Sequence, residues 1–185
     1  PILDNLIDDV TGLIRHFGKD RAVVVGHDWG AAVAWGVALK HPEYVSRLVA
    51  MQVPPPAAWR ANMTLKQALR SWYMLFFQIP FLPEWLISLN DFASIERTLK
   101  GTRGFTSTDI AVYKKALREP NALTSAVNYY RANFTALFLQ KKKQDDSEDL
   151  RDDRVRVPTL LIYSERDKYL VPETLRDVGR FVDAP

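Results

Sequence analysis

The chain has 185 residues, of which 47% are hydrophobic and 25% are charged, which is typical of one globular domain or part of one. Its formal net charge is +3 and the basic residues are scattered, so the sequence lacks the basic patch of a nucleic-acid-binding protein and favours a small uncharged partner. There are no cysteines, which excludes disulfides and thiolate catalysis and is compatible with a cytoplasmic location. Neither a metal nor an organic cofactor is predicted, because the three histidines are scattered and no carboxylate cluster has ligand spacing.

Helix and strand patterns alternate in the first part of the chain. Residues 2–18 place apolar side chains at helical intervals. Residues 22–26, "AVVVG", form a short apolar run that predicts a strand buried on both faces, as in a parallel sheet covered by helices. An alanine-rich helical pattern at 31–42 and a second strand pattern at 45–53 follow. This order predicts an α/β fold.

The character of the sequence changes at Pro54. Helical, aromatic-rich patterns follow, at residues 65–77, 95–100, 109–119 and 126–138. The longest apolar stretch, 72–89, is interrupted by Pro80 and Pro83, so it predicts two short helices around a turn and no membrane span. Packing within the domain is the expected role of this stretch, and contact with a membrane surface is the alternative.

A strand and a turn return at residues 157–167, "VPTLLIYSERD", after a charged connector at 141–154. The sequence therefore predicts a parallel-strand sheet flanked by helices, with a helical insertion between two of its strands. The expected parts are a first core segment at 1–53, a helical cap at 54–150 and a second core segment at 151–185. No oligomeric state is predicted.

The segment "VVVGHDWG", residues 23–30, places Asp28 between a strand and a helix. A turn this tight forces its central residue into a strained backbone conformation, and we expect it to need small residues at Gly26 and Gly30. The turn would expose the Asp28 side chain beside the backbone N–H groups at the start of the helix. Position 28 is thus the predicted seat of a nucleophile, and a phosphate-binding turn or simple close packing are the alternatives.

An aspartate at this position indicates a particular chemistry. A carboxylate with a pKa of about 4 is already ionised at neutral pH and can attack a saturated carbon that bears a leaving group. The product is an alkyl ester of the enzyme, which water must then hydrolyse. That second step needs a base, usually a histidine oriented by another carboxylate, and an oxyanion hole formed by backbone N–H groups.

The segment "GHDWGAAVAW", residues 26–35, resembles the nucleophile elbow of epoxide hydrolases of the α/β-hydrolase fold, and haloalkane dehalogenases have a similar Asp-Trp elbow. The segments "SWYMLFFQ" and "NYYRAN" resemble those that hold the two tyrosines gripping the epoxide oxygen in this family. By position these are Tyr73 and Tyr130, with Tyr129 as the nearest competitor for the second role. Phenols with a pKa of about 10 stay protonated at neutral pH and can donate to a developing alkoxide.

The segment "PTLLIYSERDKYLVP", residues 158–172, resembles the strand and turn that carry the charge-relay acid, which falls on Asp167; a turn aspartate is the alternative role. The resemblance implies an epoxide hydrolase with an epoxide and water as substrates. The aromatic and aliphatic residues at 72–85 suggest that the epoxide is small and apolar. Trp29 is expected to line the pocket or to pack in the core. A dehalogenase-like hydrolase and a catalytically inactive binding module are the alternatives.

Two parts of the family pattern are not found in the 185 residues: the histidine that follows the acid, and the His-Gly-x-Pro segment that precedes the first strand. His16, His27 and His41 are poor substitutes by position. We therefore expect the chain to be an internal fragment that cannot turn over by itself. We also expect the strand at 22–25 to expose an apolar edge, which favours aggregation.

Overall fold

The computed structural model describes residues 2–102, 104–138 and 154–184. The described residues fall into two compact units. The larger unit combines the chain up to Trp72 with the chain from Asn133 onward, and the smaller unit comprises Tyr73–Ala132. The expected parts at 1–53, 54–150 and 151–185 stay a prediction, because the boundary at 150/151 lies outside the described residues.

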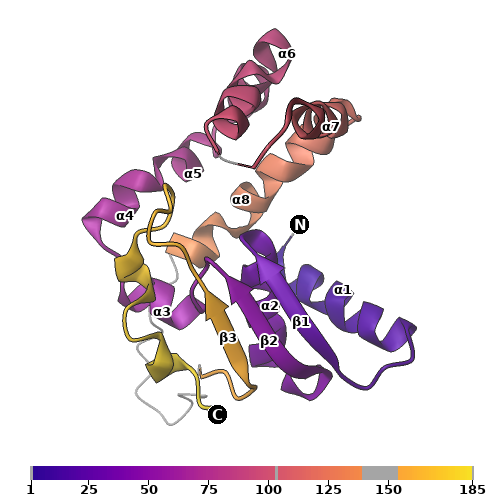
Figure 1. The fold of residues 1–185 in the computed structure, drawn as a ribbon, viewed down its shortest axis with the longest axis vertical. Coiled ribbons are helices and arrows are strands. Elements are labelled where there is room, and N and C mark those ends of the chain that lie inside the picture. Colours follow the sequence, from indigo (N-terminus) through magenta and orange to yellow (C-terminus); the bar gives the residue numbers. More distant parts are fainter. Residues whose placement is uncertain (1, 103, 139–153, 185) are drawn as a thin grey trace. The chain divides into compact units, whose positions relative to one another are not determined.

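A parallel sheet is the centre of the larger unit. It consists of β1 (Ala22–His27), β2 (Val45–Met51) and β3 (Thr159–Ile162), in the order β1-β2-β3 (Figure 1). Both pairings are parallel, with Val25 opposite Val49 and Val49 opposite Leu160. The predicted α/β organisation is therefore confirmed, and the three predicted strands are its strands.

Two helices pack with the sheet to form the core. α1 (Leu3–His16) packs against α2 (Trp29–Lys40), which lies across one face of the sheet (Figure 1). α2 is buried along most of its length because its small side chains allow close packing against the strands. Trp35 is fully buried, and its indole N–H donates to the Val53 carbonyl at 2.9 Å, so this large side chain leaves no polar atom unsatisfied.

The expectation that the first strand is buried on both faces is wrong for the described residues. Val24 points into the core, whereas Val23 and Val25 are 55% and 58% exposed. Leu160 and Ile162 of β3 are also exposed. Because side chains alternate along a strand, these residues share a face that none of the described helices covers.

Helices make up the described chain between β2 and β3. They are α3 (Pro56–Ala61), α4 (Leu65–Arg70), α5 (Trp72–Phe76), α6 (Leu82–Lys100), α7 (Ser107–Arg118) and α8 (Ala122–Phe138). The pattern at 65–77 forms two helices, because α4 ends at Arg70 and α5 begins at Trp72. α6 is kinked at residues 89–92, where the backbone leaves helical conformation. None of the described helices has the length and apolar content to cross a membrane.

Three short 3₁₀ turns complete the described structure of the larger unit. They are η1 (Pro42–Tyr44), η2 (Pro172–Leu175) and η3 (Val178–Phe181). η1 leads from α2 into β2, and its first residue is a proline, which suits a turn start because it lacks an N–H. η2 and η3 follow β3 and bring Val182 beside Val155 in an isolated parallel bridge.

In the turn from β1 to α2, the backbone at Gly26 passes close to the backbone of Gly30 and Ala31. A β-carbon on Gly26 would lie less than 3.0 Å from backbone atoms of Gly30 and Ala31, so only glycine fits. A β-carbon on Gly30 would meet open space, so the expectation that Gly30 must also be small is wrong. Asp28, between them, has φ 53° and ψ −125°, a strained conformation for a residue with a side chain.

Alanine substitution should have different effects on stability at Gly26 and at Gly30. Gly26→Ala should destabilise the fold by about 1–3 kcal/mol or more, because backbone atoms would have to move. Gly30→Ala should be neutral or stabilising by up to about 1 kcal/mol, because alanine favours the first turn of α2. Urea unfolding of both variants measures the difference, and equal destabilisation would contradict the asymmetry.

Candidate active site

The carboxyl ends of the three parallel strands meet at one edge of the sheet, which is where α/β proteins usually bind ligands. Asp28 follows β1, Gln52 follows β2 and the segment 163–167 follows β3. The Gln52 backbone N–H donates to the Ile162 carbonyl at 2.8 Å. Its side-chain oxygen accepts from the Ser164 N–H at 2.9 Å, and its amide donates to the Ser164 carbonyl at 3.3 Å. Gln52 therefore fastens the chain after β3 to the end of β2.

Asp28 is the residue before the first turn of α2. Its carbonyl accepts from the N–H groups of Ala31 at 2.9 Å and Ala32 at 3.1 Å, while its side chain does not cap the helix. The residue is exposed to solvent. The strained backbone thus uses the main chain of Asp28 to begin the helix and leaves its carboxyl group available to a ligand.

Partial burial raises the pKa of the Asp28 carboxyl above the ordinary value of 3.8. The charge of His27 and the backbone N–H of Trp29 lower this pKa, whereas the negative charge of Asp167 raises it further. Loss of hydration disfavours the charged form of a carboxyl group, which is why desolvation raises its pKa. The two aspartates, 139 positions apart in sequence, therefore influence one another electrostatically.

Asp167 is half-buried in the loop after β3. Its Oδ1 accepts from the backbone N–H groups of Tyr169 at 2.6 Å and Leu170 at 2.7 Å. This is the turn geometry typical of an aspartate that orders its own loop. Asp167 therefore has the structural role of a turn aspartate that was the alternative prediction. These hydrogen bonds orient its carboxyl group.

Two residues of α4, neither of them predicted from the sequence, hold this loop. Arg70 donates to the Asp167 carbonyl at 3.0 Å. Gln67 is buried; its amide donates to the Tyr169 carbonyl at 2.9 Å, and its oxygen accepts from the Val171 N–H at 2.9 Å. These contacts join residues about a hundred positions apart. The sequence feature that could have indicated this helix is Thr64, because a threonine is a common N-cap. Its hydroxyl accepts from the Gln67 N–H and so fixes the start of α4.

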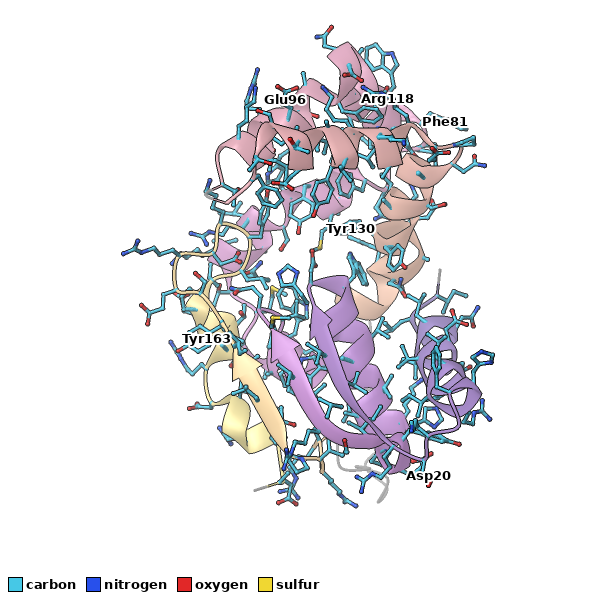
Figure 2. The ribbon with its side chains drawn as sticks, turned by 45° about the vertical axis from the view of Figure 1, so that its right-hand side comes forward. Asp20, Phe81, Glu96, Arg118, Tyr130 and Tyr163 are labelled. Atoms are coloured by element: carbon cyan, nitrogen blue, oxygen red, sulfur yellow. The ribbon has the colours of Figure 1, made fainter. Side chains whose placement is uncertain are left out.

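The two predicted tyrosines lie together in the smaller unit. The rings of Tyr73 on α5 and Tyr130 on α8 have their centroids 5.8 Å apart at an interplanar angle of 80°. Phe77 completes the cluster, with its ring 5.6 Å from Tyr73 and 4.9 Å from Tyr130. Edge-to-face contacts of this kind are favourable for aromatic rings. Figure 2 shows Tyr130 on α8.

The remaining candidates are placed as follows. Trp29 is half-buried at the start of α2, and Tyr129 is half-buried on α8. His16 ends α1, His27 ends β1 and His41 follows α2. In the part of the chain that the structure describes, no three side chains of histidine, cysteine, aspartate or glutamate are grouped so that they could hold a metal ion.

Residues 2–183 match the family described as the alpha/beta hydrolase fold. The AB hydrolase superfamily protein YfhM of Bacillus subtilis (strain 168) is 33% identical over 183 residues, covering 96% of this chain and 60% of that protein. Epoxide hydrolase 3 of Xenopus tropicalis is 34% identical over 193 residues, covering 99% of this chain and 50% of that protein.

Among solved structures, an epoxide hydrolase of Bacillus megaterium in complex with an inhibitor has a TM-score of 0.80 and 25% identity, covering 99% of this chain and 66% of that one. The chain thus spans about half to two thirds of the length of these relatives. The sheet, its helices and the family match over nearly every residue agree with the fold predicted from sequence. The chain belongs to the family of the alpha/beta hydrolase fold.

Proposed function

We propose that the protein is an epoxide hydrolase in which Asp28 is the nucleophile and Tyr73 and Tyr130 bind the epoxide oxygen. The observation that carries this proposal is the position of Asp28, an exposed carboxyl group on a strained turn at the start of a buried helix. Similarity to proteins named epoxide hydrolases supports the choice of reaction. The pairing of the two phenols supports the choice of epoxide over halide.

In the first step, a carboxylate oxygen of Asp28 forms a bond to an epoxide carbon as the bond from that carbon to the epoxide oxygen breaks. The oxygen develops negative charge and takes a proton from one of the two phenols while the other donates a hydrogen bond. Tyrosine suits this role because its hydroxyl group stays protonated at neutral pH, yet is acidic enough to transfer its proton to an alkoxide. The product is an ester of Asp28.

In the second step, water attacks the carbonyl carbon of this ester, and the diol leaves with the oxygen through which it was attached. The proton from water would go to a histidine that is oriented by Asp167 and is not among these 185 residues. The backbone N–H groups beside Asp28 stabilise the negative charge on the tetrahedral intermediate. The proton then returns to the phenolate, so that Asp28 and both tyrosines regain their starting states.

We further propose that the substrate is a small apolar epoxide. Aromatic and aliphatic side chains dominate the segment that contains Tyr73, and the phenols are the polar groups assigned to the epoxide oxygen. Trp29, which follows the nucleophile directly, is proposed to line the binding site. This arrangement, a mostly apolar site with a few placed polar groups, is usual for small-molecule pockets.

The nucleophile can be tested by mass spectrometry of the intact protein after exposure to styrene oxide. We expect a mass increase of one epoxide, mapped to Asp28 by peptide analysis and lost in Asp28→Asn. Because His16, His27 and His41 are poorly placed to act as the base, the ester should persist in the 185-residue chain. Continuous diol formation by the 185-residue chain, or label on another carboxylate, would overturn the assignment.

The two phenols should matter for an epoxide and not for a halide, because a departing halide needs no proton. Tyr73→Phe and Tyr130→Phe should slow alkylation of Asp28 by styrene oxide roughly 10²–10⁴-fold. Both should leave alkylation by a primary alkyl bromide unchanged. Tyr129→Phe is the matched control on the same helix. Equal slowing with both electrophiles would instead favour a dehalogenase-like site.

Alkylation should depend on the ionisation of Asp28. The attacking form is the charged one, so a pKa raised above 3.8 moves the acidic limb of the rate profile to higher pH. Asp167→Asn removes a negative charge that raises this pKa and should therefore move the limb to lower pH. Rates of adduct formation measured between pH 3 and pH 8 test the sign, and a shift to higher pH would contradict it.

A further inference from the structure

We propose that Arg131, paired with Glu84, is a positioning residue that fixes the relative placement of Tyr73 and Tyr130. This inference rests on the proposed function, because it concerns the two phenols assigned to the epoxide oxygen. It arises from a set of hydrogen bonds inside the smaller unit, and none of these bonds involves a phenol directly.

Arg131 connects three segments of the smaller unit. Its Nε donates to the Phe77 carbonyl at 2.8 Å, just after α5, and its Nη2 donates to the Ile79 carbonyl at 2.8 Å. Its two terminal nitrogens donate to the two carboxylate oxygens of Glu84 in the first turn of α6, at 2.9 Å for the longer contact. A fifth hydrogen bond, from Nη1 to Asn128 Oδ1 at 3.3 Å, stays within α8.

The Arg131–Glu84 pair is largely buried, with 22% and 17% of the two side chains exposed. The hydrogen bonds from Arg131 lower the pKa of Glu84, so the pair remains charged at neutral pH. Pairs of this kind add little net stability but are costly to break on one side, because the remaining charge is left without its partner. A role in fixing geometry therefore accounts for the pair better than a role in stability.

The residues that Arg131 holds are those that carry the phenols. Arg131 follows Tyr130 in α8. Phe77, whose carbonyl it binds, contacts both tyrosine rings, and the Phe77 N–H donates to the Tyr73 carbonyl at 2.9 Å. One guanidinium group thus ties the Tyr130 helix to the end of the Tyr73 helix. If the phenols shifted by 1 Å relative to one another, the loss of rate would be of the order of 100-fold.

The geometry requires arginine in particular. A guanidinium group offers five donors in a planar fork, and here they reach two carbonyl groups and a carboxylate simultaneously. The ammonium group of lysine has the same charge but cannot span these acceptors. Arg131→Lys therefore separates a need for charge from a need for this arrangement of donors.

Arg118 provides the matched control. It is another arginine of the smaller unit, and its Nε donates to an Asp91 carboxylate oxygen at 3.0 Å. Within the described part of the chain, its hydrogen bonds go to Asp91 and not to carbonyl groups near the tyrosines. Figure 2 shows it with Glu96 at the α6–α7 end of this unit. Arg118→Met removes another arginine–carboxylate pair, in which both side chains are about half exposed, without touching the contacts around Phe77.

The test measures the rate of Asp28 alkylation in the full chain against the concentration of styrene oxide. Arg131→Met and Arg131→Lys should both lower the maximal rate roughly 10–100-fold, with the half-saturating concentration unchanged. Alkylation by an alkyl bromide should be unaffected, and Arg118→Met should behave as the wild type. Nuclear Overhauser contacts between the rings of Tyr73 and Tyr130 should weaken in both Arg131 variants.

Rescue by Arg131→Lys, or equal slowing with both electrophiles, would overturn the inference. If Arg131→Met does not fold, Glu84→Gln keeps the shape of the carboxylate partner and should change the rate in the same direction. If Tyr73→Phe leaves the rate unchanged, the proposed function fails. The positioning role is then decided by the ring contacts alone, and unchanged contacts in the Arg131 variants would refute it.

Discussion

The close passage of Gly26 past the backbone of Gly30 and Ala31 is the constraint on which the candidate site depends. It lets β1 turn directly into α2 with one residue at the apex, and that residue is Asp28, with φ 53°. The strain at the apex is held by the packing of α2 on the sheet, where Trp35 and its neighbours are fully buried. Core packing therefore offsets the backbone strain at Asp28, and the strained backbone keeps the carboxyl group of this residue exposed.

The residues around the proposed chemistry are held by amides and guanidinium groups. In the larger unit, Gln52 and Gln67 bind backbone groups of the chain after β3, and so they fix the loop that carries Asp167. In the smaller unit, Arg131 does the same for the end of α5. Each of these side chains binds main-chain atoms.

Local pattern was sufficient for the strands, most helices and the turn at Asp28, because each depends on neighbours within a few residues. The pairing of Tyr73 with Tyr130 was predicted through resemblance, since nothing in the spacing of 57 residues indicates contact. Gln67 was missed for the same reason, as its partners at Tyr169 and Val171 are about a hundred positions away. The requirement for Gly30 was overestimated because the direction of a missing β-carbon depends on backbone angles that the sequence does not give.

The order of the strands also has a kinetic meaning. β1 and β2 are separated by one helix and can pair early, whereas β3 joins β2 only after about a hundred residues of intervening chain. Closing so long a loop costs conformational entropy before any hydrogen bond between β2 and β3 can form. The loop that carries Asp167 follows β3, so the acid should reach the neighbourhood of Asp28 late in folding. A chain stalled before that point would already have its elbow built but would lack the second aspartate.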